Sequence, residues 1–267
     1  RHGCAAGMHQ KALDEVYWPR IQRSGDNYLC KKLGAFATDL AVLAHFFAVP
    51  WSMPAAGLTD LWKAWILNEA AFRLRALGRL TEAAEPIQAS IEMIVQQERW
   101  KDAAIGASNL SELYLTSGDL AQAVAAGRQS VELADRSEDA AWRMAFRTTL
   151  ADALHQAGEL AESHALFAEA EKMQQERQPE YDRLYSLWGF RFCDLLLAGG
   201  AWPEVRGRAE QWLKWRTQGN SLLDDSLEYL ILGRAAVQEA IAQADLPIIS
   251  GLAPDLACVH PLGGYVE

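Results

Sequence analysis

The sequence predicts an all-α protein built from a stack of antiparallel helix pairs, and three observations predict it. A glycine turn recurs along the chain at intervals of 40, 40 and 42 residues. Apolar residues at helical spacing flank each turn on both sides. Small or apolar residues also recur at fixed distances from each turn. Together these features indicate one helix–turn–helix unit repeated along the chain.

The turns are the most regular part of the pattern, because glycine adopts the left-handed conformation of a tight helix-to-helix turn without strain. The turn glycines are Gly78, Gly118, Gly158 and Gly200. Five residues after each of them comes Ala83, Ala123, Ser163 or Val205. We expect the two helices of a pair to cross closely at these mostly small side chains.

The spacing also predicts where each helix lies. First helices of the pairs are expected near 60–76, 101–116, 140–156, 180–198 and 222–243, and second helices near 81–98, 120–136, 160–177 and 203–217. Two further helices are expected at 9–23 and 27–48, the latter continuous. The predicted organisation is an N-terminal helical cap or degenerate repeat (1–50), an extended linker (51–61), an array of four to five helix pairs (62–243) and an irregular tail (244–267).

This pattern resembles the tetratricopeptide repeat (TPR) family, in a long variety of 40–42 residues similar to the arrays of bacterial regulatory and signalling proteins. The resemblance covers roughly residues 62 to 243, although the signature tryptophan of the family's first helix is missing. It implies a right-handed superhelix, an α-solenoid whose first helices line the concave face. It also implies a binding role in the bacterial cytoplasm.

The family register assigns specific side chains to that concave face. They are Asn68, Phe72, Arg75, Ser108, Asn109, Glu112, Thr148, Asp152, His155, Phe190, Arg191, Asp194, Leu230 and Arg234. One slot holds three successive acids, Glu112, Asp152 and Asp194, which would form a ladder of carboxylates suited to a basic or amide-rich peptide. The alternative is that they are ordinary solvated acids of an acidic protein. The Lys, Arg and Asn pattern of family members that clamp a terminal carboxylate is absent.

Composition excludes several other classes of function. The chain has 35 acidic and 25 basic residues, a formal net charge of −10 that disfavours nucleic acid. The four cysteines form no Cys-x-x-Cys pair, and the apolar stretches are too short to span a bilayer. No phosphate-binding loop, nucleophile elbow or zinc motif occurs. We therefore expect no catalysis, no cofactor and no metal, with self-association left open.

Two functional interpretations remain. The first is a cytoplasmic protein- or peptide-binding scaffold that uses the concave face. The second is the regulatory or sensor arm of a larger signalling NTPase or protease. Both assign binding rather than chemistry to these residues.

Overall fold

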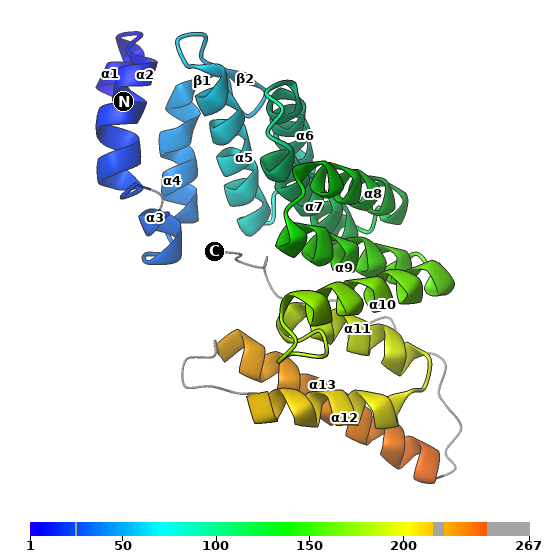
Figure 1. Ribbon diagram of the computed structural model, residues 1–267. Coiled ribbons are helices and arrows are strands. Elements are labelled where there is room, and N and C mark those ends of the chain that lie inside the picture. The colour runs from blue at the N-terminus through cyan, green and yellow to red at the C-terminus, as the bar shows by residue number, and fades with distance from the viewer. Residues whose placement is uncertain (25, 216–221, 245–267) are drawn as a thin grey trace. The chain divides into compact units, whose positions relative to one another are not determined.

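The computed structural model describes residues 1–24, 26–215 and 222–244. These residues form two compact units, one spanning Arg1–Ser137 and one beginning at Glu138. Apart from one short hairpin, the regular structure of the described residues is helical, and successive helices pack as antiparallel pairs (Figure 1). The predicted all-α class is confirmed.

The first unit opens with short helical segments rather than two long ones. They are α1 (His2–Ala5), α2 (His9–Ala12), which runs on into a π-helical segment (Leu13–Ile21), α3 (Tyr28–Lys31), α4 (Phe36–Leu43) and a 3₁₀ turn (Ala44–Phe46). The prediction of one continuous helix over 27–48 is wrong. Gly34 breaks it, since its φ of +61° lies in the left-handed region.

A hairpin follows where an extended linker was expected. Strand β1 (Phe47–Val49) pairs antiparallel with β2 (Met53–Pro54). Trp51 turns the chain with a φ of +67°, and its ring lies 5.4 Å from that of Phe47. The prolines that exclude helix here still allow a short hairpin at the edge of the unit.

Two helix pairs complete the first unit. They are α5 (Asp60–Ala76) with α6 (Leu80–Gln96), and α7 (Trp100–Ser117) with α8 (Leu120–Ser137). Small side chains hold each pair together, because a serine hydroxyl can reach the backbone of the facing helix. Ser90 Oγ donates to the Ala64 carbonyl oxygen at 2.8 Å, and Ser111 Oγ donates to that of Ala123 at 2.8 Å.

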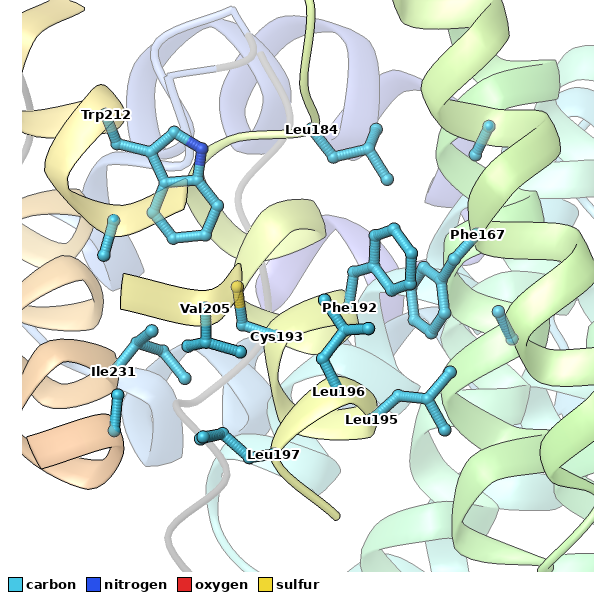
Figure 2. Packing of buried hydrophobic residues seen from close by; sticks show 14 of the residues in the cluster. Phe167, Leu184, Phe192, Cys193, Leu195, Leu196, Leu197, Val205, Trp212 and Ile231 are labelled. Atoms are coloured by element: carbon cyan, nitrogen blue, oxygen red, sulfur yellow. The ribbon is translucent and has the colours of Figure 1, made fainter. Parts of the chain in front are cut away.

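The second unit contains α9 (Ala140–Gln156), α10 (Leu160–Arg177), α11 (Ser186–Ala198), α12 (Trp202–Trp215) and α13 (Leu222–Gln243). Its core is aromatic at the centre. The rings of Phe167 and Phe192 stack at 4.9 Å and 10°, beside Leu195 and Leu196 (Figure 2). The alternating small and large side chains of α10 and α11 let these helices approach closely enough for the rings to stack.

Helix α11 begins six residues later than the predicted start at 180. Leu184 is fully buried ahead of the helix, and its N–H donates to Glu171 Oε1 at 3.0 Å. The same carboxylate accepts from Arg208 at 2.6 Å. This contact ties α12, α10 and the segment before α11 together, so tertiary bonding takes the place of the expected first helical turn.

All four turn glycines have positive φ, between +74° and +83°. A Cβ atom built on any of Gly78, Gly118, Gly158 or Gly200 would meet nothing within 4 Å. Backbone conformation, rather than lack of space, therefore requires glycine at these turns.

Candidate functional site

The inner row is the set of first-helix side chains that the sequence assigns to the concave face. In the first unit it comprises Asn68, Phe72 and Arg75 of α5, and Ser108, Asn109 and Glu112 of α7. Arg75 and Glu112 join the two helices, with Nη2 and Oε2 3.0 Å apart and both side chains largely covered. Successive first helices are thus linked directly through the row.

Other members of the row in the first unit serve partly in packing. The Phe72 ring lies 5.9 Å from that of Phe36 in α4, and Ser108 is buried. Asn68 and Asn109 are half-buried. The two asparagines and the ion pair are therefore the polar groups that this part of the row presents.

In the second unit, the inner row continues on α9 and α11. Asp152 is buried, and its Oδ2 lies 3.2 Å from Nε of Arg191. Arg191 also donates to Thr149 Oγ1 at 3.3 Å. Thr148 is fully buried and donates to the Ala145 carbonyl oxygen, so it contributes to helix packing and is not open to a partner.

Asp194 forms the next link of the row. Its Oδ1 lies 2.5 Å from Nη2 of Arg234 on α13, and its Oδ2 lies 3.8 Å from Nδ1 of His155 on α9. Phe190 packs against the core of the unit, whereas Leu230 is exposed. Asp194 therefore joins three successive first helices through one carboxylate.

These contacts change the expected electrostatics of the row. Each of the three acids lies against an arginine of a neighbouring first helix: Glu112 with Arg75, Asp152 with Arg191, and Asp194 with Arg234. A cationic ligand would have to compete with these arginines. The row presents paired charges of both signs instead of a ladder of open carboxylates.

A buried polar network in the first unit was not predicted from the sequence. Arg73 pairs with Asp39 at 2.7 Å and with Glu69, while the Tyr17 hydroxyl and the Gln22 amide donate to Asp39. Burial raises the pKa of Tyr17 well above its usual range. Burial by itself would lower the pKa of Arg73, but the two carboxylates and Tyr17 outweigh it and raise that pKa.

One signal in the sequence could have located this network. Arg73 follows Ile66 by seven residues and Ala70 by three, which places it on the apolar face of α5. A charge at such a position needs a buried partner. The partner, Asp39, is 34 residues away, and local spacing does not identify it.

Features of metal or membrane proteins were also sought. Among the residues that the structure describes, no three His, Cys, Asp or Glu side chains gather closely enough to hold a metal ion. Within the same residues, no helix is both long and apolar enough to cross a bilayer.

The structure is similar to solved structures of a kinesin light chain-like protein of Podosopora anserina with nearly identical TPR-like repeats. A variant of those repeats that carries one substitution aligns with a TM-score of 0.51 and 15% identity, covering 91% of this chain and 99% of that one. This chain has a TPR-like repeat fold. A second structure of those repeats aligns with a TM-score of 0.49 and 16% identity, covering 84% and 92%. No protein-family model and no curated protein sequence matches the chain.

Proposed function

We propose that this chain is a non-catalytic scaffold that holds a protein or peptide on the inner row of its first helices. The observation that carries the proposal is the cross-helix ion pairing of the row. Side chains that are already fixed by a partner lose little conformational freedom when a ligand binds. The row is therefore a pre-organised polar surface, which favours recognition of a defined segment.

The chemistry of the row favours a partner rich in amides or carrying both charge signs. Asn68 and Asn109 can each donate and accept hydrogen bonds. Arg234 keeps 43% of its side chain exposed while it holds Asp194, so it can contact a ligand without breaking that pair. A purely basic peptide would gain less, since the carboxylates it needs are already engaged.

The net charge of −10 makes nucleic acid an unfavourable partner for such a scaffold. We place the protein in the cytoplasm, in keeping with its few cysteines and its similarity to regulatory arrays. The same surface would serve whether the chain acts alone or as the regulatory arm of a larger NTPase or protease.

The test compares two sets of substitutions that remove the same amount of charge. The first set, Glu112→Gln, Asp152→Asn and Asp194→Asn, alters the inner row. The matched set, Glu132→Gln, Glu162→Gln and Glu210→Gln, alters exposed positions of second helices. Partners captured by the full chain would be identified by mass spectrometry, and the affinity of each purified partner would be measured for both triple variants.

A partner held on the inner row should lose at least tenfold in affinity with the first set and little with the second. Urea titration of both variants would show whether the fold survives. Equal losses from both sets would indicate general acidity as the cause. No loss from either set, with the fold intact, would place the binding surface elsewhere and refute the proposal.

A further inference from the structure

The outer face of α13 is apolar although the described structure leaves it uncovered. It consists of Leu223, Ser226, Leu230, Gly233, Val237, Ala240 and Ala244. Leu230 and Val237 are 51% and 59% exposed, and none of the seven residues is charged. The opposite face, with Leu227, Ile231 and Ala235, is buried in the second unit, and Figure 2 shows Ile231 beside Val205.

A helix that is apolar on two opposite faces is normally covered on both. The helix that ends a repeat array needs a polar outer face to remain soluble. Helix α13 lacks one. Its outer face therefore has the composition of an interface rather than of a solvated end.

The repeat shows what should cover this face. Positions equivalent to Gly233 in the four preceding first helices are Ala71, Ser111, Ala151 and Cys193, and all are buried. The second helix of the same pair covers this position: Ser111 Oγ donates to the Ala123 carbonyl oxygen of α8, and Ser163 Oγ of α10 donates to that of Ala151.

The position of Tyr229 leads to the same conclusion. Its equivalent in α11 is Gly189, where an added Cβ atom would lie 2.4 Å from the Trp212 ring of α12. Tyr229 is 57% exposed, and a Cβ atom on Gly233 would meet nothing within 4 Å. Helix α13 thus carries the contact surface for a second helix, and within the described residues no helix lies on it.

The spacing of the outer face suits one straight helix. Leu223, Leu230, Val237 and Ala244 recur every seven residues, and so do Ser226, Gly233 and Ala240, three residues after the first set. This is the two-position heptad pattern along which a second helix packs lengthwise. Glycine and alanine in one row allow the two backbones to approach closely.

The residues that follow α13 do not have the sequence of such a helix. The chain's own second helices, α6, α8, α10 and α12, are 14 to 18 residues long. Pro247, Pro254 and Pro261 recur every seven residues after α13. A proline inside a helix costs about 3 kcal/mol, so this segment opposes a helix of that length.

We propose that the outer face of α13 binds one amphipathic helix of another protein, which takes the place of the missing second helix and continues the stack. The chain's own second helices define the chemistry of that helix. They bury a small or β-branched residue at one position (Ala83, Ala123, Ser163, Val205) and further apolar or small residues four and seven positions later. This surface is separate from the inner row and does not depend on the function proposed for it.

The test presents such a helix to the full chain. A second copy of 119–138, the α8 segment, would be appended after Glu267 through a flexible linker of about 20 residues, which gives a millimolar effective concentration. Hydrogen exchange of residues 226–240 would be followed by mass spectrometry. The control is the same fusion with Ala123→Glu and Ser130→Glu in the appended copy only, which removes its packing face.

We expect exchange of residues 226–240 to slow at least tenfold with the appended helix and not with the control. Gly233→Trp should abolish the protection, because it fills the close-approach row, and Gly233→Ala should retain it. Absence of protection, or equal protection by the control, would overturn the proposal.

Two measurements on the unfused protein distinguish other occupants. Deletion of residues 245–267 should leave exchange of α13 unchanged, and light scattering should show a monomer. Faster exchange after the deletion would mean that the chain's own tail covers α13. A dimer that Gly233→Trp dissociates would mean that a second copy does. Either result would overturn the proposal.

Discussion

Asp39 and Arg73 form an ion pair at 2.7 Å in which neither side chain has any solvent exposure. Arg73 comes from the first helix of the first repeat, and Asp39 comes from α4 in the N-terminal segment. The pair therefore fixes the N-terminal segment to the repeats. Because Glu69 also contacts Arg73, one cation balances two carboxylates, and the two kinds of partner should not be equivalent on removal.

Arg73→Met should destabilise the protein more than Asp39→Asn. The first change leaves two buried carboxylates without a cation and should cost about 3–5 kcal/mol of unfolding free energy. The second keeps the Arg73–Glu69 pair and should cost about 1–3 kcal/mol. Urea unfolding followed by tryptophan fluorescence measures both, with Arg79→Ala in an exposed pair as the control. The opposite order would show that Asp39 is the residue on which the network depends.

The turn glycines and one glutamate should respond in opposite directions to substitution. Gly118→Val should cost about 1 kcal/mol or more, since φ is +80° and valine is strained there. Glu98, in the turn between α6 and α7, has a φ of +55°. Glu98→Gly should relieve that strain and raise stability by up to about 1 kcal/mol. Urea titration would contradict this explanation if both changes had the same sign.

The stability of the fold should fall in alkaline solution. Burial raises the pKa of Cys193 to about 12 and that of Cys30 to about 11, from 9.0. The unfolded chain loses these protons first, so the stabilisation is complete below pH 9 and is lost as pH rises from 9 toward 12. Urea midpoints at pH 8 and 10.5 measure the loss. Cys193→Ala should reduce the difference between the two midpoints, and an unchanged difference would exclude this thiol as a cause.

The inner-row pair of Asp152 and Arg191 should show strong energetic coupling. Both side chains are largely covered, so each carries a desolvation cost that the other offsets. A double-mutant cycle with Asp152→Asn and Arg191→Met should give a coupling of about 1–3 kcal/mol. The exposed pair of Lys172 and Glu176, with Lys172→Met and Glu176→Gln, is the control and should give almost none. Equal coupling in the two cycles would remove the argument for a pre-organised row.

Much of the fold could be predicted from the sequence because its signals are local. Helix α9 spans the predicted range, and α5 and α13 do so as well, since apolar spacing and a following turn define a helix without reference to the rest of the chain. The break at Gly34 was equally local and was missed because it lies inside an otherwise apolar helical pattern. The late start of α11 was not local, as it depends on the contact between Leu184 and Glu171.

The sequence by itself determined the repeat, its turns and the residues assigned to the inner row. Only the tertiary structure decided how those residues are used. Asp152 meets Arg191 because two first helices lie side by side although these residues are 39 positions apart, and the outer face of α13 is recognisable as uncovered only beside the buried positions of earlier repeats. Periodicity records which face of a helix is apolar. Charge pairing and burial depend on distances between helices, which no local pattern contains.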